Sequence, residues 1–528
     1  DPDAWSICEG VLASECAEGS RVYAMQILTQ MIKTRWNLLE DDQRDEVRMF
    51  LTRLILLLLK SGRKSTLINY ANTAMTRIFL NDWPSRHPEM LQNYIKFYEN
   101  NAAMTINTMT IIHYICQHAI DTADSDLTSK QESQILLGLS EVAKLIEPTI
   151  PNILRSGNIS FIKEALGVYK YIAKWLTPNL EILSFIINDL LTNDQLFGCV
   201  LDAIGAIVVS SDDKKEIAPA VFESVINRLR QKWPTNIDFD VIADDTTSEL
   251  VSFAEIMKLF LSEFRESIQE SCSSDLISTA LNWLISLTNV DVPEIFNSCS
   301  EFWCVVCHEI ALACNDPSFQ LDQMYAYSLE QIRRVYPNRM PRPDNIILII
   351  DDAGNLVRTE QKNTAESVFS NQLKHLVIDL ATIDIDDTIS AADVAFQNAM
   401  RTQQCIEQVI WFVGAFSQVV SNKHLNVIIR FLSKMLLFCD TTQDQNMKMV
   451  YSSSFFYLCT RYPSFVGSNI AFMQKVFEIM FKFIETKNPT IQEMVVLNFQ
   501  KLCYGCRRKL CAGKNPCLNY LLEKFNEI

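Results

Sequence analysis

Glycine is scarce in this sequence, with 13 residues in 528, or about 2.5% against a usual value of about 7%. Doubly wound sheets, barrels and propellers need glycine at tight turns and phosphate loops, so the scarcity disfavours these folds. Histidine is scarcer still, with 6 residues, which leaves few candidates for a general base. Neither a phosphate-loop motif nor a Gly-x-Ser-x-Gly nucleophile motif occurs. The sequence therefore predicts a protein that is not an enzyme.

Long hydrophobic runs are also missing. The densest run, Leu54 to Leu59, is far shorter than the roughly 18–20 residues of a membrane span. Basic residues are outnumbered, and the formal charge is −16. An acidic surface repels nucleic-acid phosphates and suits a basic protein partner. We therefore expect no membrane segment, no direct binding to nucleic acid, and a protein as the main partner.

Helical periodicity is abundant, and apolar residues make up 48% of the chain. Stretches such as Val47 to Leu58, with apolar residues three or four apart, alternate with short polar breaks. Helix pairs of HEAT type take about 44 residues, which gives about 12 pairs in 528. We predict an all-α HEAT-repeat solenoid of antiparallel helix pairs forming a superhelix. The 16 cysteines, mostly in apolar patterns, are typical of a protein from a reducing compartment.

One segment departs from the helical pattern. The β-branched run Ile346 to Ile350 is followed by a turn-rich Asp351 to Asn355 and by Leu356 to Arg358. This order predicts a β-hairpin inserted in the solenoid. It is either a surface excursion packed on helices or a loop that contacts a partner, and insertions in repeat arrays often lie on the binding face.

Two cysteine clusters resemble known ligand spacings. Cys304-x-x-Cys307-His308 has the spacing of a haem attachment site, but it lies inside an apolar helical run. Cys503, Cys506, Cys511 and Cys517 could supply four thiolates to zinc, although their spacing is shorter than in common zinc ribbons and Cys503 continues a core stripe. We expect neither a metal nor a cofactor.

Two predicted helices, 425–439 and 471–484, carry more apolar surface than an outer solenoid helix needs to bury. Composition leaves two interpretations equally open. One is tight packing between layers at a bend in the array. The other is a hydrophobic groove that accepts an amphipathic peptide through anchor residues at positions i, i+3 and i+7 of the peptide.

Several motifs resemble the chromosome-region-maintenance exportin (exportin one) family of the karyopherin-beta, or importin-beta, superfamily. They are Ile32 to Trp36, Asp82-Trp83-Pro84, Glu301-Phe302-Trp303, Arg461 to Phe465, and Val476 to Ile484. These motifs occur in the family's order, and the resemblance covers the N-terminal half of a family member. It implies a nuclear export receptor with a hydrophobic groove for leucine-rich export signals.

The resemblance also implies which residues form the sites. The groove would be lined by Leu432, Leu436 and Cys439 on one outer helix, by Phe465, Phe472, Ile479 and Phe483 on the next, by Ser452, Phe456 and Met494 at the floor, and by Lys448 at the rim. Cys439 matches the cysteine that covalent export inhibitors attack. The hairpin residues Asp351, Asp352, Asn355 and Arg358 would belong to the Ran-binding loop.

The implied organisation has four parts. They are N-terminal Ran-binding repeats (1–120), middle repeats (121–340), the acidic-loop hairpin (341–370) and the groove repeats (371–528). The implied partners are Ran-GTP, cargo proteins with leucine-rich signals, and nucleoporins with Phe-Gly repeats. A monomer that shuttles between nucleus and cytoplasm is expected. The alternatives are an importin-beta-type import receptor, with cargo on an acidic concave face, and a structural HEAT scaffold.

Overall fold

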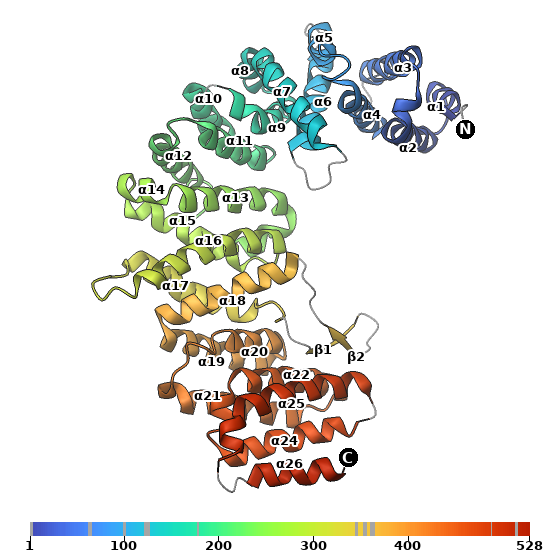
Figure 1. Ribbon diagram of the computed structural model, residues 1–528. Helices are drawn as coiled ribbons and strands as arrows, with labels where there is room; N and C mark the ends of the chain where they lie inside the picture. The colour runs from blue at the N-terminus through green and yellow to red at the C-terminus, as the bar shows by residue number, and fades with distance from the viewer. Residues whose placement is uncertain are drawn as a thin grey trace. The chain divides into compact units, whose positions relative to one another are not determined.

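A computed structural model describes residues 4–61, 66–98, 102–120, 127–176, 179–343, 347–351, 356–359, 365–486, 488–512 and 516–527. Helices account for nearly all the regular structure in these ranges, and the strands found there form one two-stranded hairpin (Figure 1). The prediction of an all-α solenoid of helix pairs with one β-hairpin is confirmed. None of the helices described is both long and apolar enough to span a bilayer.

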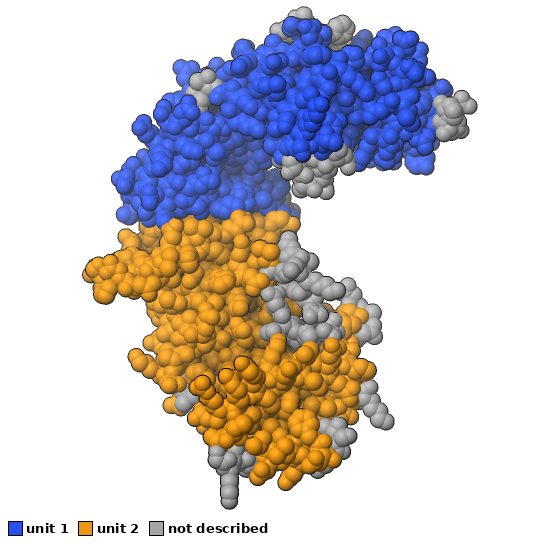
Figure 2. Space-filling view, viewed as in Figure 1, with its two compact units in different colours: residues 1–235, 244–277 blue, residues 236–243, 278–528 orange. Residues whose placement is uncertain are grey.

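The chain divides into two compact units, coloured separately in Figure 2. Unit 1 comprises Asp1–Thr235 and Asp244–Ile277. In it α2, α4, α6, α9 and α11 pack one against the next in a row, and α3, α5 and α12 each pair with a member of that row. The bounds are α1 Ala4–Ala13, α2 Glu18–Arg35, α3 Asp41–Lys60, α4 Thr66–Asp82, α5 Met90–Tyr98, α6 Ala102–Ile120, α7 Ser129–Ile146, α8 Ile150–Leu154, α9 Ile159–Ile172, α10 Leu180–Phe185, α11 Phe197–Ser210, α12 Lys214–Leu229, α13 Ala243–Glu263 and α14 Arg265–Ser271.

Unit 2 comprises Asn236–Ala243 and Ser278–Ile528. Its helices also form two rows. In the row that we call the hairpin-side row, α16, α18, α20, α22 and α25 pack consecutively; α17, α19, α21 and α24 form the second row. The bounds are α15 Ser274–Asn289, α16 Pro293–Ala313, α17 Gln323–Val335, α18 Ala365–Ile383, α19 Ile385–Thr402, α20 Ile406–Ala415, α21 Leu425–Thr441, α22 Gln445–Arg461, α23 Pro463–Val466, α24 Ile470–Ile484, α25 Pro489–Leu510 and α26 Pro516–Glu527, with β1 Ile347–Ile350 and β2 Leu356–Thr359.

Local sequence explains where the unit 2 helices begin. Asp444, Asn469 and Asn488 each precede a helix, and each side chain accepts hydrogen bonds from backbone N–H groups of the first turn. These caps satisfy donors that have no partner within the helix. Pro489 then occupies the first position of α25, where its missing N–H costs nothing. The caps therefore fix where α22, α24 and α25 start, and with them the positions of the candidate groove residues.

The core of unit 2 combines large aromatic side chains with a few satisfied polar groups. Trp303 and Tyr336 are fully buried. The indole N–H of Trp303 donates to Thr288 Oγ1 at 3.0 Å, and the Tyr336 hydroxyl donates to Ser300 Oγ at 2.9 Å. A buried polar group that lacks such a partner costs free energy, so these pairs let bulky aromatic rings fill the space between the helices.

Candidate functional site

The residues expected to line a groove lie on five helices of unit 2. Leu432, Leu436 and Cys439 are on α21, Lys448, Ser452 and Phe456 on α22, Phe472, Ile479 and Phe483 on α24, and Met494 on α25. Phe465 was expected on the same helix as Phe472, but it lies on the separate short helix α23, because the backbone breaks from 467 to 469 before the Asn469 cap. The second row thus contributes both walls, and α22 and α25 lie beneath them.

Most of these side chains are packed inside the protein. The buried members are Leu432, Cys439, Ser452, Phe456, Phe465, Phe483 and Met494. Phe456 of α22 meets Phe483 of α24 edge to face, with ring centroids 5.7 Å apart. Leu436, Lys448, Phe472 and Ile479 are half-buried and reach the surface. In this conformation, a peptide would therefore meet only those four side chains unless the packed layer beneath them rearranges.

Cys439 is held in the packed layer. Only 3% of the surface of Cys439 is exposed. Burial raises the pKa of the Cys439 thiol to about 12, although a hydrogen bond with Ser452 acts in the opposite direction. Because the thiolate is the reacting form, a thiol in this state reacts slowly. Its assignment as the inhibitor-reactive cysteine stays a prediction.

The hairpin is seated on the hairpin-side row. β1 and β2 pair antiparallel, with Leu348 opposite Arg358, and the hairpin contacts α22 and α25. Leu348 is fully buried, and its backbone N–H donates to Ser453 Oγ of α22 at 3.2 Å. Ser453 adjoins Ser452, so the same turn of α22 contacts the hairpin and contributes to the candidate groove floor.

The expected Ran-loop residues are only partly visible. Asp351 is half-buried just after β1. Asp352 and Asn355 lie outside the described residues. Arg358 lies in β2, in register with Leu348. The hairpin therefore places the backbone of this loop beside α22, and the assignment of these four residues to Ran stays a prediction.

The family-like motifs near the N-terminus form a buried polar cluster in unit 1. The Trp36 indole N–H donates to Asp82 Oδ1 at 2.9 Å, and both residues are at most 1% exposed. Arg86 lies 3.3 Å from the same carboxylate. These residues therefore join the short turn after α2, the last residue of α4 and the segment that follows α4. The face of α2 that remains exposed carries Gln26, Lys33 and Arg35.

The cysteine clusters do not converge. The Cys506 thiol donates to Pro463 O at 3.2 Å and the Cys517 thiol to Ile470 O at 3.4 Å, whereas Cys511 is exposed. His308 pairs with Asp379 at 3.3 Å, and Cys307 is buried. Across the ranges the structure describes, no group of three or more His, Cys, Asp or Glu side chains is placed to hold a metal ion.

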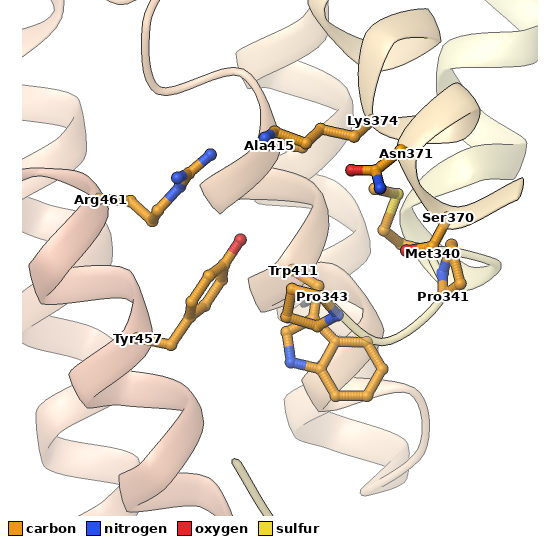
Figure 3. Close-up of a pocket in the computed structure, with 10 residues that line it drawn as sticks. All are labelled: Met340, Pro341, Pro343, Ser370, Asn371, Lys374, Trp411, Ala415, Tyr457 and Arg461. Atoms are coloured by element: carbon orange, nitrogen blue, oxygen red, sulfur yellow. The ribbon is translucent and has the colours of Figure 1, made fainter. Parts of the chain in front are cut away.

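A polar cavity of about 90 Å³ lies on the hairpin-side row (Figure 3). It is lined by Met340, Pro341, Pro343, Ser370, Asn371, Lys374, Trp411, Ala415, Tyr457 and Arg461. No sequence pattern indicated this cavity. Its residues come from four separate segments, and the spacing of four within α20 and α22 is too common in helices to mark a site.

Comparison with known protein families identifies the class of protein that this chain resembles. Residues 1–56 match the family described as importin-beta N-terminal domain. Residues 321–388 match the family described as CRM1 / Exportin repeat 2. With the helix-pair solenoid, these two matches make the chain similar to nuclear transport receptors of the karyopherin type.

Within that class, the similarity is to exportin-1. Exportin-1 of Dictyostelium discoideum is 21% identical over 99% of this chain and 53% of its own length. Protein EXPORTIN 1A of Arabidopsis thaliana is 22% identical over the same shares. Exportin-1 of Drosophila melanogaster is 20% identical over 96% of this chain and 50% of its own length. The chain thus spans about half the length of these relatives, and its resemblance to the exportin-1 family runs nearly end to end.

Proposed function

We propose that this chain acts as a nuclear export receptor that binds leucine-rich export signals cooperatively with Ran-GTP. It would carry cargo past nucleoporins with Phe-Gly repeats, as a monomer that shuttles between nucleus and cytoplasm, and without a chemical step. The observation that carries the proposal is the similarity to exportin-1 proteins over 99% of the chain. That similarity extends through α21 to α25, where the candidate groove residues lie.

The burial of the groove lining suggests how cooperativity arises. Seven of the eleven candidate side chains are packed inside, so a signal peptide binds fully only after the layer formed by α21 to α25 rearranges. A receptor whose competent state is about 1% populated binds its ligand about 100-fold more weakly than its intrinsic affinity. Ran-GTP and cargo that both favour the separated state would then each raise the affinity of the other.

A peptide-binding measurement tests the proposal. A fluorescently labelled leucine-rich export peptide is titrated with the chain, with and without Ran-GTP, and anisotropy is recorded. Ile479→Glu places a charge at a half-buried position of α24. Because burying an unpaired charge against an apolar peptide is costly, we expect at least a tenfold loss of peptide affinity.

Leu437→Glu is the matched control. Leu437 is on α21 but 66% exposed, and at 100° per residue it lies well away from the face that carries Leu432, Leu436 and Cys439. It should leave peptide affinity unchanged. The export proposal fails if the peptide does not bind the chain at all, whether or not Ran-GTP is present. It also fails if both variants reduce peptide affinity equally.

An import receptor is the second candidate, favoured by the match of residues 1–56 to the importin-beta N-terminal domain. It predicts that a basic import peptide binds the chain and that Ran-GTP displaces the peptide. The sign of the Ran-GTP effect therefore separates the two: Ran-GTP tightens binding of an export cargo and weakens binding of an import cargo.

A further inference from the structure

The cavity in Figure 3 is surrounded by hydrogen-bond donors. Lys374 comes from α18, Trp411 from α20, and Tyr457 and Arg461 from α22. In the figure, the ends of Lys374, Arg461 and Tyr457 point toward a common space. No carboxylate is among the described residues that line it, although the chain as a whole carries 63 acidic residues against 47 basic ones. The described lining thus carries two basic side chains and no carboxylate, in a protein with an excess of acidic residues.

Tyr457 gives an independent sign that the cavity is built for a ligand. The residue is only 3% exposed, its hydroxyl makes no hydrogen bond with any residue that the structure describes, and the hydroxyl oxygen is not fully enclosed by protein atoms. Buried tyrosine hydroxyls usually find a partner. Burial raises the pKa of Tyr457 to about 12, so the hydroxyl stays protonated and available as a donor.

Trp411 repeats this pattern on the facing helix. It is 6% exposed, lines the same cavity, and its indole N–H has no partner among the described residues. An indole N–H only donates, so the missing partner must be an acceptor. Trp411 and Tyr457, on adjacent helices, thus each carry a polar group at the edge of this cavity that has no hydrogen-bond partner among the described residues, and the Trp411 nitrogen is enclosed by neighbouring atoms.

The lack of a side chain at Gly414 makes room for the ring of Tyr457. A Cβ atom at this position would lie 2.6 Å from Tyr457 Cε1, so only glycine lets the ring pass. The carbonyl of Gly414 also accepts a hydrogen bond from Arg461 Nε at 3.2 Å. This bond orients the guanidinium while its two terminal nitrogens make no hydrogen bond with the described residues. Gly414 thus positions both the hydroxyl and the cation.

We propose that this cavity binds a small oxyanion, of the size and charge of phosphate, through Arg461 and Tyr457, with Trp411 forming part of the wall. The volume of about 90 Å³ is about three times the share of one water molecule in the liquid and is far below the 300 Å³ or more of sites for drug-sized ligands. The ligand is therefore a single phosphate group rather than a nucleotide. A guanidinium fork with neutral donors beside it is the arrangement that recognises phosphate oxygens.

Phosphorus-31 NMR of inorganic phosphate titrated with the chain tests the proposal, at constant ionic strength so that general screening does not change. Phosphate should bind with a measurable dissociation constant. A hydrogen bond to a charged group corresponds to a factor of about 10 to 100 in affinity, so Arg461→Gln and Tyr457→Phe should each weaken binding at least tenfold. A phosphoserine peptide in parallel distinguishes a free ion from a phosphate carried on a protein.

Two controls keep the test decisive. Tyr457→Phe removes a hydroxyl that has no hydrogen-bond partner among the described residues, so its thermal unfolding midpoint without phosphate should equal that of the parent chain. Arg430→Gln removes the same charge from an exposed position on α21 and should leave phosphate binding unchanged. If phosphate and phosphoserine both fail to bind, or if Tyr457→Phe and Arg461→Gln bind phosphate as tightly as Arg430→Gln does, the proposal is wrong.

Discussion

Cys439 and Tyr457 occupy opposite rows of the same unit, and burial raises the pKa of each to about 12. Their surroundings nevertheless differ. Cys439 is enclosed in an apolar layer and is hydrogen-bonded with Ser452, whereas the Tyr457 hydroxyl faces a cavity and has no partner among the described residues. Burial and a raised pKa therefore do not mark a binding site by themselves. What distinguishes the two regions is whether the buried polar group is already satisfied.

The difference implies two modes of partner binding. The second row would gain affinity by exposing and then covering apolar area, which requires the helices to move. The cavity on the hairpin-side row would bind through donors that are already in place. The first mode depends on a conformational equilibrium and the second on fixed hydrogen-bond geometry. Three further measurements test this contrast.

The largest expected effect concerns the reactivity of Cys439. A pKa of about 12, against the ordinary thiol value of 9.0, lowers the thiolate fraction about 10³-fold. Labelling with iodoacetamide at pH 8, followed by peptide mass spectrometry, should therefore modify Cys439 at least 10³-fold more slowly than the exposed Cys511. In urea the two rates should converge. If iodoacetamide modifies Cys439 as fast as Cys511 in the folded protein, the thiol of Cys439 is already accessible. The two regions would then not differ in how their buried groups are enclosed.

The next effect concerns Glu407 of α20, which lies near the cavity. Burial raises the pKa of Glu407 to about 7 from 4.5, despite the opposing charge of Arg342. A raised carboxyl pKa means that the stability contributed by its protonated form is complete below about pH 4.5 and is lost as pH rises through 7. At 1.36 kcal/mol per pKa unit, the loss is at most about 3 kcal/mol.

Glu407→Gln removes this pH dependence. Urea unfolding should show the variant more stable than the parent chain at pH 8, by up to about 3 kcal/mol, and the gap should narrow toward pH 5. Glu485→Gln, at an exposed position after α24, is the matched control. If the variant and the parent chain differ in free energy of unfolding by the same amount at pH 5 and pH 8, the pKa of Glu407 is not raised. The surroundings of Glu407 would then not be enclosed.

Sequence patterns revealed one of these regions and not the other, for a physical reason. The apolar surplus on α21 and α24 is a local, periodic signal, and so are the β-branched run and turn residues that predicted the hairpin. The cavity instead joins Met340, Lys374, Trp411 and Tyr457, which lie up to 117 positions apart in the chain. Each of these residues has an ordinary role in its own helix, so only the packing of three helices shows their common function.

The burial of the candidate groove residues was not predictable either. Phe472 and Phe483 belong to the same apolar pattern, yet one reaches the surface and the other packs on Phe456. The choice depends on how closely α24 approaches α22, which the periodicity of a single helix does not determine. Cys503, by contrast, was rightly placed in a helical stripe, since it lies within α25.

The smallest expected effect comes from Gly414→Ala. The added Cβ would lie 2.6 Å from the Tyr457 ring, so the ring must shift. Overpacking of this kind costs about 1–3 kcal/mol, which urea unfolding at pH 7 would measure. Because the shift moves the Tyr457 hydroxyl within the cavity, phosphate binding should weaken, while export-peptide binding on the second row should not change. If Gly414→Ala instead weakens peptide and phosphate binding equally, the two rows are coupled through α22, and they cannot be treated as independent sites.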